Sequence, residues 1–131
     1  MTFEVKHVAV SINRPAETVY AFASDPQNLP AWAAGLSGSI RKEGDDWIAE
    51  SPMGTVKVKF ETTNTFGILD HEVRLPSSQK VYNPMRVFPN NDGCEVVFSV
   101  YRLPEMSAEE FQRDAGTVAA DLRKLKELME K

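Results

Sequence analysis

The chain has 131 residues and a net charge of −4 at pH 7, with 42% hydrophobic and 26% charged residues. These values predict one globular domain over residues 1–131 and argue against a nucleic-acid surface. The start, MTFEVKHVAV, lacks a signal-peptide pattern, and no apolar run approaches the ~20 residues that span a bilayer, so we expect a cytoplasmic protein.

The first third of the chain predicts a strand and two short helices. FEVKHVAVSI alternates apolar and polar residues as a strand does, and a helix is expected over 15–23. Asp25 and Pro26 are typical of the start of a second short helix, which carries Trp32. Three strands are then expected within 38–44, 46–52 and 54–62.

The rest of the chain predicts three more strands and a long helix. The strands are expected within 68–75, 80–88 and 94–103, and Pro84 indicates an edge, a bulge or a break. Ser107 and Glu110 form a capping box that begins the helix. Its single apolar stripe consists of Phe111, Ala115, Val118, Leu122, Leu125 and Met129. This pattern predicts an α+β fold in which the helix covers one face of an antiparallel sheet.

The cysteine and histidine content limits the chemistry that we expect. One cysteine, Cys94, excludes an internal disulfide, and its expected place in a hairpin turn after Gly93 offers nothing that would make a reactive thiolate. Two distant histidines and one cysteine give no metal-ligand spacing, and the sequence has no glycine-rich phosphate loop. We therefore expect no metal and no other cofactor.

The order of these elements resembles a known family. The similar segments are VAVSINRPAETVYAFASDPQNLPAWAAGL, the strand with Asp70 and His71, NPMRVFPNNDGCEVVFSVYRLPEMSAEEF and the terminal helix. Together they resemble the SRPBCC, or START-like, superfamily, and within it the bacterial polyketide cyclase/dehydrase-like and uncharacterised SRPBCC proteins. The resemblance implies a helix-grip fold: a curved antiparallel sheet of about seven strands wrapped on a long C-terminal helix, with two short helices after the first strand and an apolar cavity. The superfamily includes lipid and hormone binders, polyketide cyclases, ubiquinone-binding proteins and Hsp90 ATPase activators, so the fold alone does not select a function.

His71 is the first candidate for chemistry, because a histidine can exchange a proton near neutral pH. Strand alternation places it inward and puts Asp70 in a solvated outer row. As a general acid or base it would work with a second polar group. The candidates for that group are Tyr82, Tyr101 and Ser99. The alternative is an ordinary half-buried histidine that hydrogen-bonds a backbone carbonyl or a hydroxyl group.

Large apolar side chains are together the candidates for a ligand pocket, although any single one of them is more often simply part of the core. Trp32 is expected near the cavity mouth, and Arg86 could hold a carboxylate or phosphate if it points inward. The predicted ligand-binding residues are Trp32, Trp47, Met53, Phe60, Leu69, His71, Val73, Met85, Arg86, Phe98, Phe111, Val118 and Leu122.

Three functions are compatible with these features. The first is binding of a small apolar or aromatic molecule that is polyketide-, lipid- or quinone-like. The second is a cofactor-free cyclase or dehydratase that uses His71 as acid or base. The third is a protein-interaction module that resembles the Hsp90 ATPase activators. The expected partner is a small hydrophobic molecule, with no nucleic acid and no membrane span, and a homodimer is left open.

Overall fold

Residues 1–36 and 39–131 are described here from a computed structural model. Within them the chain forms eight strands and three α-helices, with two short 3₁₀ helices. The elements are β1 (Val5–Ile12), α1 (Ala16–Ala23), η1 (Pro26–Asn28), α2 (Leu29–Trp32), η2 (Ala34–Leu36), β2 (Ile40–Glu43), β3 (Asp46–Ser51), β4 (Gly54–Phe60), β5 (His71–Arg74), β6 (Lys80–Asn83), β7 (Met85–Asn90), β8 (Gly93–Tyr101) and α3 (Ala108–Met129).

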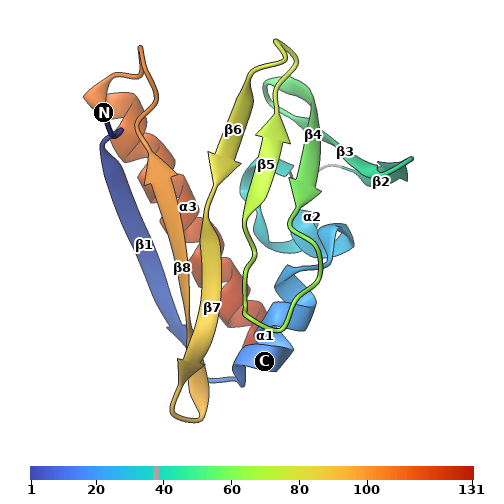
Figure 1. Ribbon diagram of the computed structural model, residues 1–131. Helices are drawn as coiled ribbons and strands as arrows, with labels where there is room; N and C mark the ends of the chain where they lie inside the picture. The colour runs from blue at the N-terminus through green and yellow to red at the C-terminus, as the bar shows by residue number, and fades with distance from the viewer. Residues whose placement is uncertain (37–38) are drawn as a thin grey trace.

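The strands form two antiparallel sheets, ordered β1-β8-β7 and β2-β3-β4-β5-β6. In Figure 1, α3 runs behind the sheet that β1, β8 and β7 form, and its C-terminal end meets α1. The expected α+β fold, with a long C-terminal helix against antiparallel strands, is confirmed. Gly38, the first residue of the strand expected over 38–44, lies outside the described residues.

Pro84 divides the strand that was expected over 80–88. β6 belongs to one sheet and β7 to the other. Pro84 has no N–H to donate to a strand ladder, and its carbonyl oxygen accepts a hydrogen bond of 2.9 Å from the Ser99 amide of β8. The described chain consequently has eight strands rather than about seven, in two sheets rather than one.

The segment before β5 connects the two sheets. The Leu69 amide donates to the Met85 carbonyl oxygen at 2.8 Å, and the Val87 amide donates to the Gly67 carbonyl oxygen at 2.9 Å. Gly67 has a φ of 72°, and a Cβ atom at this position would overlap the Val87 carbonyl oxygen. Only glycine fits this crossing. The strand expected over 68–75 is shorter because its first residues pair with β7 instead.

α3 begins and ends at identifiable contacts. The Ser107 hydroxyl accepts a hydrogen bond of 3.1 Å from the Glu110 amide, which confirms the predicted helix start. At the other end, Arg14 Nη1 donates to the Met129 carbonyl oxygen at 2.7 Å, and Lys126 Nζ donates to the Ser11 carbonyl oxygen at 2.7 Å. These bonds attach the last turns of α3 to the end of β1 and to the link between β1 and α1.

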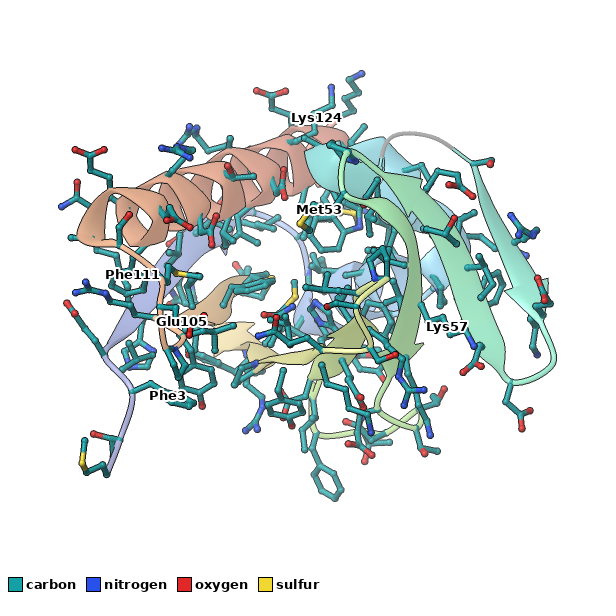
Figure 2. All side chains as sticks on the ribbon, turned by 90° about the horizontal axis from the view of Figure 1, so that it is seen from above. Phe3, Met53, Lys57, Glu105, Phe111 and Lys124 are labelled. Carbon is teal, nitrogen blue, oxygen red and sulfur yellow. The ribbon has the colours of Figure 1, made fainter. Side chains whose placement is uncertain are left out.

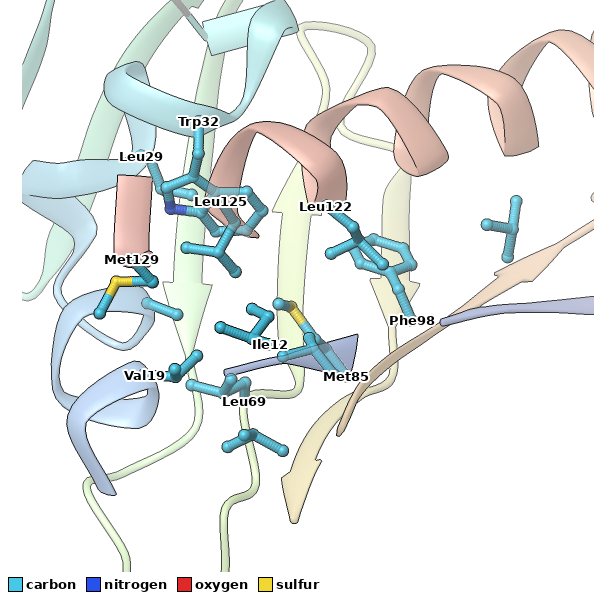
Figure 3. Close-up of a cluster of buried hydrophobic side chains, with 14 of the residues drawn as sticks. Ile12, Val19, Leu29, Trp32, Leu69, Met85, Phe98, Leu122, Leu125 and Met129 are labelled. Atoms are coloured by element: carbon cyan, nitrogen blue, oxygen red, sulfur yellow. The ribbon is translucent and has the colours of Figure 1, made fainter. Parts of the chain in front are cut away.

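The most completely buried part of the core lies beneath the C-terminal half of α3. Trp32 and Leu29 from α2 pack there with Leu125 and with residues of both sheets (Figure 3). Its fully or almost fully buried members include Ile12, Val19, Leu29, Trp32, Leu69, Met85, Leu122, Leu125 and Met129. We call this region the closed end.

Across the described ranges, no helix is long and apolar enough to cross a membrane.

Candidate functional site

A cavity of about 530 Å³ opens at the other end of α3, which we call the open end. α3 packs against β1 and β8, and the cavity lies where its N-terminal half faces β5 and β6. The strands contribute Val73, Val81, Tyr82, Asn83, Phe98, Val100 and Tyr101; the helix contributes Glu110, Asp114, Thr117 and Val118. The turns and loops around the mouth contribute Met53, Leu75, Gln79, Leu103, Pro104, Glu105 and Met106.

The walls of the cavity are apolar because of strand alternation and helix periodicity. Phe98 and Val100 lie on the inward face of β8, and Val73 continues this surface on β5. In Figure 2, which looks down on the molecule, Met53 extends into the space beside α3, whereas Lys124 and Lys57 point outward. Val118 supplies the helix side of the apolar wall. The cavity can therefore enclose a hydrophobic body.

The loop between β8 and α3 forms one side of the mouth and is fixed from outside by Arg102. Arg102 Nε donates to the Met106 carbonyl oxygen at 3.0 Å, and its Nη1 donates to Glu4 Oε1 at 3.2 Å. Within this loop Glu105 has a φ of 72°, a left-handed conformation that costs a non-glycine residue about 1–2 kcal/mol. The loop is therefore held in a defined shape.

Three carboxylates border the cavity, from Glu105, Glu110 and Asp114. Partial removal from water raises the pKa of the Asp114 carboxyl, the charge of Glu110 raises it further, and Arg113 opposes both. All three carboxylate residues are exposed at the surface, so their charges lie where the cavity meets water. The apolar wall thus ends in an acidic mouth.

His71 lies at the inner side of the open end but does not line the cavity. Its ring stacks on Phe60 with a centroid distance of 4.8 Å and meets the edge of Phe98, a lining residue, at 5.6 Å. Nδ1 lies 3.0 Å from the Leu69 carbonyl oxygen, which can only accept, so Nδ1 carries the proton. Burial lowers the pKa of His71 and is only partly opposed by this bond, which leaves a neutral ring with Nε2 as an acceptor.

Asp70 is not in a solvated row, contrary to the expectation. Its side chain is 6% exposed and forms a bidentate pair with Arg86, with Nε to Oδ1 at 2.9 Å and Nη2 to Oδ2 at 2.7 Å. The Tyr82 hydroxyl donates to Oδ2 at 2.9 Å and the Met85 amide to Oδ1 at 2.8 Å. Strand alternation does put Asp70 on the outer face of the sheet, but the side chains of Arg86 and Tyr82 cover it there. Chiefly because of Arg86, the pKa of Asp70 falls to about 2.

The structure brings some of the predicted site residues to the cavity. Met53, Val73, Phe98 and Val118 line it. Tyr82 and Tyr101 also border it, but the Tyr82 hydroxyl is bonded to Asp70, and the Tyr101 ring packs edge-on against Phe3.

The other predicted residues lie away from the cavity. Trp32 is in the closed end, where its indole Nε1 has no hydrogen-bond partner among the described residues. Arg86 is held at Asp70 on the outer face, and Ser99 faces outward to His7 Nδ1 at 2.8 Å. The remaining residues that do not line it are Trp47, Phe60, Leu69, His71, Met85, Phe111 and Leu122.

Cys94 lies buried in β8 rather than in a turn, and burial raises the pKa of its thiol.

Sequence reasoning missed the polar side of the helix, the turns and loop of the mouth, and three strand residues. The missed lining residues are Leu75, Gln79, Val81, Asn83, Val100, Leu103, Pro104, Glu105, Met106, Glu110, Asp114 and Thr117. Asp114 and Thr117 flank the apolar stripe of α3, so helix periodicity could have identified them. Val100 shares the phase of Phe98, and strand alternation could have identified it too.

A metal centre is not present in the described ranges, because they contain no group of three His, Cys, Asp or Glu side chains arranged to hold an ion. The three carboxylates of the mouth therefore act as separate charges around an apolar space rather than as one ligand set. The site therefore combines an apolar cavity, negative charge at its mouth and the neutral imidazole of His71 behind Phe98.

A helix-grip fold with an apolar cavity beneath the terminal helix defines an SRPBCC-type protein. More narrowly, the chain belongs to the family described as polyketide cyclase / dehydrase and lipid transport, whose model matches residues 4–130. The expected resemblance is thereby confirmed. A comparison with curated proteins gave no match.

Solved structures share the fold at low sequence identity. An uncharacterised protein from Bacillus thuringiensis has a TM-score of 0.77 at 15% identity, with 98% of this chain and 100% of that chain covered. The Aha1 dimer from Colwellia psychrerythraea gives 0.76 at 14% identity, with 97% and 96% covered. DynU16, a protein in the dynemicin biosynthetic locus, gives 0.74 at 12% identity, with 97% of this chain and 47% of that chain covered.

Proposed function

We propose that the chain binds a small, predominantly apolar molecule in the cavity between α3 and the strands β5, β6 and β8. The observation that carries this proposal is the cavity of about 530 Å³ with walls of Val, Leu, Phe and Met side chains. Ligand sites are usually about 300–1,000 Å³ and mostly apolar. The family, which includes polyketide cyclases and lipid transporters, favours a polyketide-, lipid- or quinone-like body.

The mouth of the cavity also suits binding. Met53 and Met106 border it, and methionine adapts to irregular apolar surfaces. Met53 is 66% exposed, so a ligand that covers it removes apolar surface from water. Burial of such surface is the main source of affinity that we expect.

A bulky side chain inside the cavity tests this proposal. Val118→Trp should fill the space and weaken binding of the neutral dye Nile red by at least about tenfold, which corresponds to 1.4 kcal/mol. Ala120→Trp adds the same side chain to an exposed position of α3 that does not line the cavity and should bind the dye as the wild type does. Equal dye affinity in both variants would contradict the proposal.

Catalysis by His71 is a second proposal, favoured by its neutral ring and its position behind Phe98. On β6, Asn83 is paired with His71 across the strands and lines the cavity, so a ligand at the inner wall would be close to the imidazole. Nε2 would accept a proton from an acidic carbon, as in a cofactor-free cyclase or dehydratase.

Proton exchange measures this activity without a known substrate. Deuterium exchange at the acidic carbon of an aryl β-diketone, followed by NMR, should be about 10²- to 10⁴-fold slower in His71→Ala than in the wild type. Nile red binding measured in parallel separates loss of catalysis from loss of the cavity. An exchange rate unchanged by the substitution would remove His71 from any mechanism.

Protein assembly is a third proposal, favoured by one structural neighbour that is described as a dimer. Phe66 and Phe88 are 79% and 47% exposed, which leaves apolar surface that a second copy or another protein could cover. Light scattering over a range of concentrations should show a mass that rises toward that of two chains. A constant mass of 14.7 kDa would contradict a homodimer.

A further inference from the structure

We propose that the cavity selects an apolar molecule whose polar end is a protonated amine, and that it disfavours the same molecule ending in a carboxylate. This inference rests on the proposed binding function and adds the charge of the ligand to it. The site is the cavity itself, and its selectivity comes from the distribution of charge around its wall.

All charged side chains in the cavity lining are acidic. Glu105 lies in the loop between β8 and α3, and Glu110 and Asp114 lie one turn apart on α3, so the carboxylates come from two elements at the mouth. The lining residues within the described ranges include no lysine, arginine or histidine. A ligand carboxylate at this mouth would meet three like charges and no opposite charge among the lining residues.

The two arginines next to the mouth on the loop and on α3 do not offset this charge. Arg102 faces the outer side of the loop, where it bonds Glu4 and the Met106 carbonyl oxygen. Arg113 is close enough to affect Asp114 but does not line the cavity. A positive charge supplied by a ligand would therefore be attracted by the carboxylates of Glu105, Glu110 and Asp114.

The arrangement suits an organic cation rather than a metal ion. The described residues contain no group of acidic side chains arranged to coordinate an ion, so the carboxylates surround the mouth instead of converging on one point. Below them the wall is apolar, with Val73, Val100 and Val118. An ammonium group at the mouth would keep part of its water while the attached hydrocarbon fills the cavity.

The size of the preference follows from the exposure of the carboxylates. Pairs between exposed charges contribute little, up to about fivefold each in an equilibrium constant. Two or three such pairs around one ammonium group should favour it over a neutral hydroxyl by about tenfold at low salt. Because these charges are exposed to solvent, 0.5 M NaCl should remove most of this difference, since the screening length then falls to about 4 Å.

Three ligands of equal chain length isolate the head group. Decylamine, decanol and decanoate are used at pH 7, below the concentrations at which they aggregate, to displace Nile red from the intact chain. We expect decylamine to displace the dye at the lowest concentration, decanol at about tenfold more, and decanoate at a still higher concentration. The same series is repeated in 0.5 M NaCl.

Two double variants connect the result to the mouth. Glu110→Gln with Asp114→Asn should bring the displacing concentration of decylamine to within about twofold of that of decanol, both measured on this variant. Glu109→Gln with Glu127→Gln removes the same charge from exposed residues of α3 that do not line the cavity and should keep the preference. A fall of equal size in both variants would show that only net charge matters and would overturn the inference.

The outcomes separate the two proposals. If decanol displaces the dye but decylamine is no better, or if decanoate equals decylamine, the charge selection is wrong and apolar binding stands. If none of the three displaces the dye and Val118→Trp has no effect on dye binding, the proposed function fails as well. A preference for decylamine that survives 0.5 M NaCl would also overturn the electrostatic explanation.

Discussion

The two halves of α3 lie on the same strands but face different surroundings. At the closed end, Leu125 and Met129 are buried in one cluster with Trp32 from α2 (Figure 3). At the open end, Asp114 and Val118 border a cavity of about 530 Å³. α1 and α2 cover only the closed end, whereas turns and one loop bound the other. One helix can therefore anchor the fold and leave room for a ligand, because different elements cover its two halves.

The largest expected effect compares truncation at the two ends. Leu125 is fully buried, so Leu125→Ala should reduce the free energy of unfolding by about 2–5 kcal/mol. Val118→Ala lies beside an existing cavity and should cost less than about 1 kcal/mol. Urea denaturation of both variants measures the difference. Losses of equal size would mean that the two ends are equally well packed.

The next effect concerns the outer face, where Asp70 holds the chain as it passes from β6 to β7. Asp70→Asn replaces a carboxylate that accepts four hydrogen bonds and should cost about 1–3 kcal/mol at pH 7. Arg86→Gln should have a smaller effect than Asp70→Ala, because the Tyr82 hydroxyl and the Met85 amide still bond the carboxylate without Arg86, whereas Asp70→Ala leaves the buried Met85 amide without an acceptor. The reverse order would contradict this assignment.

Acid unfolding gives an independent test of Asp70. Its pKa falls from 3.8 to about 2 in the folded chain, which corresponds to about 2 kcal/mol. A lowered pKa of an acid means that this stability is present above about pH 4 and is lost as the pH falls toward 2. The wild type should lose this increment between pH 4 and 2, and Asp70→Asn should not. Parallel denaturation curves over this pH interval make the comparison.

A smaller effect should appear at His71, on the boundary between the two ends. Burial lowers its pKa below the usual 6.5, so the folded state favours the neutral ring. The corresponding stability is complete above pH 6.5 and decreases as the pH falls below that value. His71→Phe keeps a ring against Phe60 and should remove this part of the pH dependence. An unchanged slope between pH 7 and 5 would show that His71 does not cause it.

The smallest effect is expected in the loop at the open end. Glu105→Gly should relieve the left-handed backbone at φ 72° and change the unfolding free energy by about 0 to +1 kcal/mol, whereas Glu105→Gln should leave it unchanged. Both variants should reduce the decylamine preference, since both remove one carboxylate. A destabilised Glu105→Gly would show that the Glu105 side chain stabilises the loop in a way that glycine cannot replace.

Sequence patterns predicted the elements well because each depends on local chemistry. The Ser107 cap and the apolar stripe that follows it define α3, and alternation defines β4 and β8. The division at Pro84 was predicted only as an edge, a bulge or a break. The outcome at Pro84 depends on partners that are distant in sequence. The Ser99 amide bonds the Pro84 carbonyl oxygen, and Asp70 accepts a bond from the Met85 amide.

The cavity was harder to predict than the core. An apolar residue on an inward face has the same pattern whether it meets another side chain or an empty space, so Val118 and Leu122 look alike in the sequence. Large aromatic side chains suit ligands, which is why Trp32 is expected at the mouth, but α2 turns it into the closed end. Asp114 has the pattern of a solvated helix face, although it borders the cavity. Distinguishing these cases requires the distance between α3 and each strand.

The crossing at Gly67 provides a reference point for mutational scanning. No side chain fits there without displacing the β7 backbone, so every substitution should abolish folding whatever the ligand is. Substitutions at Thr117, which is exposed and borders the cavity, should instead affect binding while leaving the amount of folded protein nearly unchanged. In a library of single substitutions scored for both protein abundance and dye binding, the Gly67 variants would thus show the signal expected for complete loss of the fold. Positions that keep abundance but lose binding would then outline the ligand site even before the natural ligand is identified.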